Sequence, residues 1–222
     1  MTSLRAEPPL SLKGTLRAEH LELTLVGSAA SLLEGDRLTI DLVVEGTVPV
    51  VVRSTAAQIA HPCLDGGSTE QHVRLRVCEQ SRLWWAVEPL IVAAGGMHTN
   101  TLHVELDRTS RAVVQEVLVL GRSGERAPDA SLRSAVSVDV DGAPLFEDGL
   151  DTSSPGAHGP AGLAGRRVIG TVGAFGWRPV AADGDMTLAG PGAIRRVLRT
   201  DAAEPIDVLS TCAASWWHAV CR

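Results

Sequence analysis

A chain of 222 residues that is 45% hydrophobic can bury a full core, either as one large domain or as two small ones. Its net charge of −6 is spread without long basic runs, and this argues against nucleic acid as a partner, because phosphate binding needs clustered Lys and Arg. No run of 18 apolar residues occurs, and residues 1–12 hold a proline pair in place of an apolar segment. We therefore expect no membrane span, no signal peptide and a cytoplasmic protein.

Apolar and polar side chains alternate in segments that recur about every 30 residues, which predicts an all-β scaffold with one buried and one wet face per strand. Three or four strands are expected in residues 12–54, followed by an irregular loop at 55–67. Asp141-Gly142 is typical of a two-residue hairpin turn. Because several connections are short, we expect mostly antiparallel neighbours. Further strands are expected at about 70–78, 82–93, 99–107, 111–120 and 132–140.

Residues 149–165 are rich in Gly, Ser and Pro and carry no periodicity, which predicts a long loop. Within a single domain spanning residues 1–222, this loop could separate a main β lobe from a smaller C-terminal lobe. Strands are expected again at about 166–175, 186–188 and 194–198. The last stretch changes to a helical period and predicts a closing amphipathic helix. Its apolar face comprises Ile206, Leu209, Ala213, Trp216, Trp217 and Val220.

The residues offer little catalytic chemistry. His61 and Cys63 are the nearest approach to a metal pair, but a zinc site would need two further ligands, and a loop histidine beside a buried thiol is the simpler interpretation. The chain has no His-x-His motif, no Gly-Lys-Ser or Gly-Lys-Thr phosphate loop and no Gly-x-Ser-x-Gly elbow. The four cysteines lack Cys-x-x-Cys spacing and are expected to be reduced thiols.

Two carboxylates stand out. Asp36 follows Gly35 and precedes Arg37 at the entry to a strongly alternating strand, and Glu88 interrupts an apolar run next to Pro89. A carboxylate inside such a run must be paired, exposed or functional, because burying it unpaired is costly. The alternatives are a turn fixed by an ion pair between Asp36 and Arg37, and a bulge that exposes Glu88.

In its order of motifs, the chain resembles the UreD (also called UreH) family of urease accessory proteins over about residues 20–222. The resemblance includes a Pro-Ala-Gly-Leu-x-Gly stretch at 160–165 and the terminal helix with its Trp and Arg residues. The remaining motifs are Glu34-Gly35-Asp36-Arg37-Leu38, Thr55-Ala56-Ala57-Gln58, Trp85-Ala86-Val87-Glu88 and Leu120-Gly121-Arg122-Ser123-Gly124-Glu125.

This resemblance implies a non-catalytic scaffold with a β-helix-like stack of sheets. Such a scaffold binds UreF, and through it the GTPase UreG, and docks the assembly on apo-urease so that nickel reaches the nascent active site; whether the assembly is a dimer of complexes stays open. It also implies nickel in transit through an internal water-filled tunnel, with no tightly bound cofactor. We expect Glu88 and Asp36 to line this route, with His61 and Cys63 as weaker candidates, and Gly35, Arg37, Gly121 and Arg122 to hold the motif loops.

Three alternatives remain open. Trp216, Trp217 and Val220 could anchor UreF or a second copy through an exposed ring, or both rings could cover the sheets of their own chain. The chain could be a β-rich metal-dependent enzyme that uses His61, Cys63 and a remote carboxylate. It could also be a carbohydrate-binding module, although it has only seven Phe and Trp residues and no Tyr.

Overall fold

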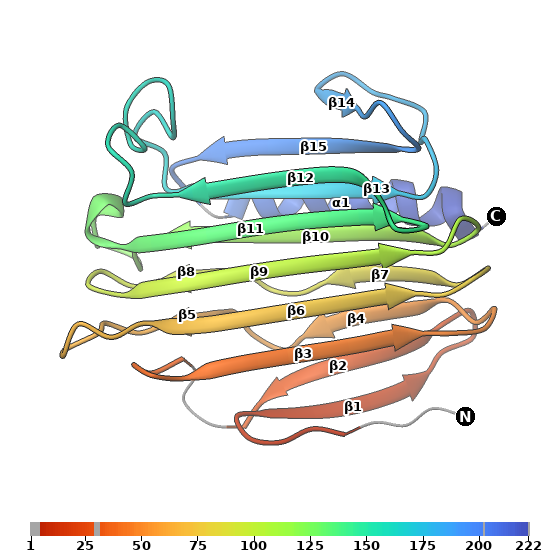
Figure 1. The fold of residues 1–222 in the computed structure, drawn as a ribbon, viewed down its shortest axis with the longest axis horizontal. Helices are drawn as coiled ribbons and strands as arrows, with labels where there is room; N and C mark the ends of the chain where they lie inside the picture. The colour runs from red at the N-terminus through yellow and green to blue at the C-terminus, as the bar shows by residue number, and fades with distance from the viewer. Residues whose placement is uncertain (1–4, 29–31, 202, 222) are drawn as a thin grey trace.

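The computed structural model describes residues 5–28, 32–201 and 203–221. Two β-sheets face each other along the molecule (Figure 1). Sheet A has the strand order β1-β2-β4-β7-β10-β13-β15-β14, with β5 and β8 beside it, and sheet B has the order β12-β11-β9-β6-β3. The elements are β1 (Leu10–Leu16), β2 (Leu21–Gly27), β3 (Arg37–Val44), β4 (Val50–Ser54), β5 (Gln58–Ala60), β6 (Thr69–Val77), β7 (Arg82–Ala86), β8 (Leu90–Val92), β9 (Met97–Leu106), β10 (Arg111–Leu120), η1 (Ala127–Asp129), β11 (Ser131–Val140), β12 (Ala143–Asp151), β13 (Val168–Phe175), β14 (Asp185–Thr187), β15 (Gly192–Arg199) and α1 (Ala203–Cys221).

The chain passes repeatedly between the two sheets, so that each turn adds one strand to each sheet. In sheet A, β2, β4, β7 and β10 begin at residues 21, 50, 82 and 111, which gives steps of 29, 32 and 29 residues. These steps correspond to the spacing of the alternating segments in the sequence. The arrangement is a β-solenoid with one C-terminal helix, and it confirms the predicted β-helix-like stack.

The strand pairing differs from the expectation of mostly antiparallel sheets. Among the described residues eight strand pairs are parallel and five are antiparallel. The short connections join strands of opposite sheets, so strands that are consecutive along the chain are usually not neighbours within a sheet. Alternation identifies a half-buried strand but carries no information on its direction.

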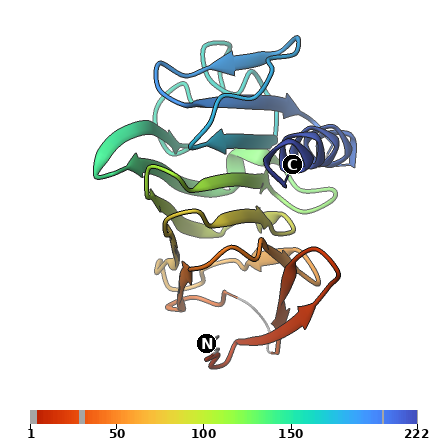
Figure 2. The ribbon, with the colours of Figure 1, turned by 90° about the vertical axis from the view of Figure 1, so that its right-hand side faces the viewer.

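Two apolar layers hold the stack together. The inward side chains of both sheets form the core between them, as in β9, where every second residue from His98 to Leu106 is buried. A second layer lies between the outer face of sheet A and α1 (Figure 2), which packs on β13, β10, β15 and β7. The predicted amphipathic helix is therefore confirmed. No helix in the described part of the chain is long and apolar enough to cross a membrane.

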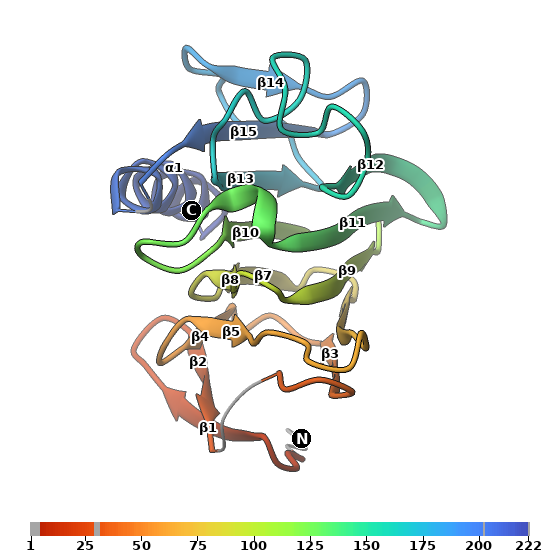
Figure 3. The ribbon, with the colours of Figure 1, turned by 90° about the vertical axis from the view of Figure 1, so that its left-hand side faces the viewer.

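Several predicted boundaries shift. The strand expected at 82–93 divides into β7 and β8, because Pro89 offers no N–H for a sheet ladder. The hairpin at Asp141-Gly142 is present, and both residues have positive φ, 50° and 74°. The loop expected at 149–165 starts three residues later, since Gly149–Asp151 belong to β12 (Figure 3). After this loop, β13 returns to sheet A and pairs with β10.

Candidate functional site

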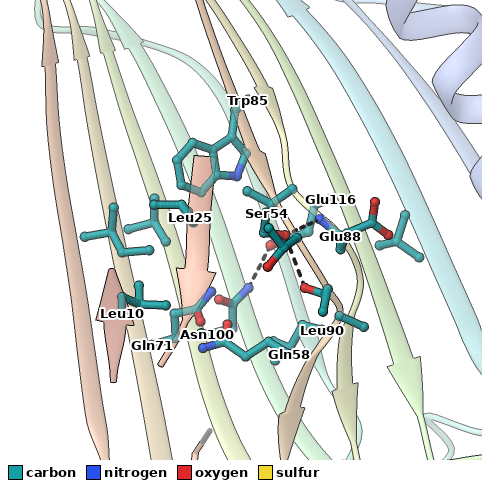
Figure 4. Close-up of a pocket in the computed structure, with 18 of the residues that line it drawn as sticks. Leu10, Leu25, Ser54, Gln58, Gln71, Trp85, Glu88, Leu90, Asn100 and Glu116 are labelled. Carbon is teal, nitrogen blue, oxygen red and sulfur yellow. Dashed lines mark hydrogen bonds between the residues drawn. The ribbon is translucent and has the colours of Figure 1, made fainter. Parts of the chain in front are cut away.

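A cavity of about 100 Å³ lies between the two sheets next to the break between β7 and β8 (Figure 4). Its apolar wall includes leucine and valine side chains and Trp85. Polar side chains from both sheets interrupt this apolar lining, which sets it apart from the rest of the core. They are Ser54, Thr55, Gln58, Gln71, Glu88, Asn100 and Glu116.

Glu116 is the carboxylate at the centre of this site. It extends from β10 into the core, and its Oε1 accepts a hydrogen bond of 2.7 Å from Nδ2 of Asn100. The residue is half-buried and lines the cavity. Burial raises the pKa of the carboxyl. The Asn100 hydrogen bond lowers this pKa, the negative charge of Asp148 raises it and the positive charge of Arg196 lowers it.

The polar groups form a row along the stacking direction. Gln71, Asn100 and Ser134 occupy register positions on β6, β9 and β11, and Asn100 also donates to Oγ of Ser134 at 3.3 Å. Oε1 of Gln71 is buried and has no hydrogen-bond partner among the described residues. This row spans the three middle strands of sheet B and ends at Leu38 on β3 and Leu150 on β12, so it provides a polar line within the core.

Glu116 also borders a second, smaller cavity of about 30 Å³ further along the stack. There Arg196 forms a bidentate ion pair with Asp148 and donates from Nε to Oγ1 of Thr171 at 3.1 Å. Thr171 lies directly opposite Glu116 in the pairing of β10 with β13. Glu116 thus lines both cavities. The neutral polar groups of sheet B line the first cavity with it, and the ion pair of Arg196 and Asp148 lines the second.

A neutral imidazole lies two residues along β9 from Asn100, on the same face of the sheet. His98 is 3% exposed, and its Nδ1 is 2.7 Å from Oγ1 of Thr69. Burial lowers its pKa to about 4, so the ring carries no charge near neutral pH. Its Nε2 has no hydrogen-bond partner in the described part of the chain.

The two carboxylates singled out from the sequence occupy different places. Glu88 is exposed at the cavity rim, and its backbone N–H donates to Oγ of Ser54 at 2.9 Å. Asp36 does not line the cavity; its Oδ2 accepts from the N–H of Leu33 at 2.8 Å within the turn before β3. Arg37 pairs with Glu70 at 2.8 Å, and Gly35 takes the left-handed φ of 87° that this turn requires. Glu88 and Asp36 are therefore not brought together.

His61 and Cys63 lie in the loop between β5 and β6. The Sγ of Cys63 is near the carbonyl oxygens of His61 and Met97, at 3.9 and 4.0 Å. Within residues 5–28, 32–201 and 203–221, no group of three His, Cys, Asp or Glu side chains is arranged to hold a metal ion. The metal role of this pair stays a prediction.

The tryptophans of α1 are inside the fold. Trp216 is 5% exposed and Trp217 is 7% exposed, and the Trp217 ring lies 5.8 Å from that of Trp84 on sheet A. Val220 is buried in the same layer. This is the arrangement expected if the rings cover the chain's own sheet. A partner-binding role for these residues remains a prediction, and it would require the helix to move away from the sheet.

The loop after β10 is fixed by Glu125. Its carboxylate accepts hydrogen bonds from the backbone N–H groups of Ala94 and Arg122 and pairs with the Arg122 side chain. These donors, the Arg122 side chain foremost, lower the pKa of Glu125 to about 2. Gly121 has a φ of 77° and lies against Glu125. Gly121 and Arg122 thus shape a tight loop.

Glu116 was missed at the sequence level. It lies in the otherwise apolar strand from Ala112 to Leu120, beside Gln115, and therefore meets the same criterion that selected Glu88. A polar pair in an otherwise apolar strand is the signal that would have found it.

The comparisons with known proteins identify the family. The model of the UreD urease accessory protein family matches residues 1–222. The chain belongs to the UreD urease accessory protein family. The urease accessory protein UreD of Parafrankia sp. is 34% identical over 234 residues, covering 91% of this chain and 78% of that protein. UreD 1 of Streptomyces griseus is 32% identical over 202 residues (90% and 78%), and UreD of Streptomyces coelicolor is 33% identical over 227 residues (96% and 88%).

Proposed function

We propose that this UreD family member is a non-catalytic scaffold in urease maturation. In this proposal it docks UreF and the GTPase UreG on apo-urease, and nickel passes through its core on the way to the urease active site. Nickel is cargo here and not a resident cofactor. Membership in a family of urease accessory proteins supports the maturation role.

The observation that carries the nickel route is the polar line within the core. A solenoid held together by apolar packing has no structural need for a carboxylate between two internal cavities, and burying one is unfavourable. Such a group is useful where a cation must cross the core. Glu116 therefore joins Glu88 as a candidate for the nickel route, and Glu88 marks the rim of the same cavity.

The chemistry of the line suits release of the ion. Amide, hydroxyl and carboxylate oxygens are harder ligands than thiolate or imidazole and hold a borderline cation less strongly. One carboxylate with neutral oxygens, such as those of Gln71 and Ser134, forms a weak binding site from which the ion can dissociate. The neutral ring of His98 adds a stronger ligand two residues along β9 from Asn100.

The proposal is tested in cells that express the urease genes and the other accessory genes, with and without this chain. The readouts are urease activity and the nickel content of purified urease. We expect both to depend on the chain, and we expect Glu116→Gln to lower both several-fold while the complex with the partners still forms. Glu147→Gln is the matched control, because Glu147 is exposed on β12 and the change in charge is the same.

Full activity without the chain would overturn the maturation role. Wild-type nickel content in Glu116→Gln would overturn the route past Glu116 and leave the scaffold role standing. The alternative of a metal-dependent enzyme has less support, because nothing in the described residues completes a ligand set around His61 and Cys63. Stoichiometric metal that survives dialysis and is lost in Cys63→Ala would favour it.

A further inference from the structure

A cavity of about 260 Å³ lies between the outer face of sheet A and α1. Arg53, Ala86 and Gln115 occupy one row of register positions on β4, β7 and β10 and line this cavity. α1 covers the same face of the sheet (Figure 2) and contributes Ile206 and Ser210 to the wall. Because the Ala86 side chain is a single methyl group between two longer neighbours, the row leaves space beneath the helix.

Two residues that line this cavity carry a buried polar atom without a partner. Gln115 is 6% exposed and Trp84 is 9% exposed, and neither Oε1 of Gln115 nor Nε1 of Trp84 has a hydrogen-bond partner among the described residues. Nε2 of Gln115 is 3.5 Å from Oγ of Ser210, which is the outer limit for a hydrogen bond, so the amide can turn at little cost. Buried polar groups in folded proteins are nearly always paired, and these two therefore indicate a ligand.

The two unpartnered groups complement a primary carboxamide. Trp84 lies on β7 opposite Val113 of β10, so Gln115 is on the neighbouring strand two residues further along the same face. The Trp84 ring supplies an N–H donor and the Gln115 amide supplies a carbonyl acceptor. A carboxamide has the matching pair, an oxygen that accepts and an NH₂ group that donates, and its second N–H can reach the hydroxyl of Ser210.

The exposed part of the cavity wall carries one charge of each sign. The Arg53 side chain is 47% exposed, and its guanidinium carbon lies 5.0 Å from the centroid of the Trp84 ring, a contact that fixes its position. Its nearest approach to Glu22 is long, at 3.9 Å. Glu88 is exposed at the same cavity. A zwitterion complements this wall, with its carboxylate at the guanidinium and its ammonium at the Glu88 carboxylate.

We propose that this cavity is a binding site for a free amino acid with a carboxamide side chain, glutamine or asparagine. The side-chain amide lies against Trp84, Gln115 and Ser210, and the α-carboxylate and ammonium lie at Arg53 and Glu88. A water molecule takes about 30 Å³, so the cavity has the room of about eight waters, which is enough for a molecule of this size. The site does not depend on the proposed function, since only Glu88 is shared with the nickel route.

The test is isothermal titration calorimetry of the full chain with L-glutamine and with L-asparagine. We expect saturable binding of at least one of them, with one site per chain. Norleucine, which has an apolar side chain of similar length, and glutaramate, which is glutamine without its amino group, should each bind more weakly by about tenfold or more. These two probes separate recognition of the amide from recognition of the zwitterion.

The variants are chosen away from the nickel route. Gln115→Leu keeps the size of the side chain and removes the amide, and we expect it to weaken binding by about tenfold or more. Ser210→Ala should weaken binding several-fold. Ser215→Ala is its matched control on the same helix, because Ser215 is exposed and does not line the cavity.

Circular-dichroism melts establish that each variant is folded. If Gln115→Leu does not fold, the comparison of Ser210→Ala with Ser215→Ala decides. The proposal is overturned if neither amino acid binds the wild-type chain, if norleucine binds as well as glutamine, or if the folded cavity variants bind like the wild type. Any of these results would mean that the cavity holds water only.

Discussion

At the scale of single residues, Glu116 is the group whose environment conflicts most with its charge. Burial raises its pKa, so the folded state holds a proton more readily than the unfolded state. The stability of the wild type should therefore fall as pH rises from the ordinary value near 4.5 toward the raised folded value. Glu116→Gln removes this dependence. We expect the variant to be more stable than the wild type at pH 8 by on the order of 1 kcal/mol.

The measurement is urea unfolding of both proteins at a series of pH values between 5 and 8. Glu147→Gln serves again as control and should follow the wild-type profile, because Glu147 is exposed. If Glu116→Gln is instead less stable than the wild type at every pH, then the ionised carboxylate is fully compensated by its neighbours, and burial does not dominate its pKa.

At the scale of elements, α1 is attached to sheet A by its buried face. Trp217 packs on Trp84, and Trp-to-Ala changes in a core cost about 3–5 kcal/mol. We expect Trp217→Ala to lower the free energy of unfolding by about 3 kcal/mol. Ser215→Ala, on the exposed side of the helix, should change it little. A Trp217→Ala variant of wild-type stability that no longer binds UreF would contradict this and support the partner-anchor role.

The sequence defined these elements well because each has one buried face. Alternation predicted β6, β9 and β11 within one or two residues, and the change of period predicted α1. Strand direction could not be predicted, since both ladder types share the same period of two. Gln71, Asn100 and Ser134 are about 30 residues apart in sequence, and only the register of the parallel strands aligns them. For this reason the sequence identified only Glu88, which lies at the rim of the candidate site.

At the scale of the whole molecule, the question is whether the loop after β12 divides the chain into independent parts. The segment beyond it contributes β13, which pairs with β10 over eight positions, and α1, which packs on β10 and β7. We expect these contacts to hold the two parts together without the covalent link. The test inserts the recognition sequence of a site-specific protease after Gly156, which is exposed, has a φ of 84° and has open space around it.

After cleavage, the two fragments should elute from a sizing column in native buffer at the position of the uncut insertion protein, and they should separate only in denaturant. The physical reason is that a strand in the interior of sheet A cannot leave without exposing its ladder of backbone groups and the apolar layer beneath α1. Fragments that separate in native buffer would show that the loop joins two autonomous lobes. In that case the contact between β10 and β13 would be an interface between domains and not part of one continuous core.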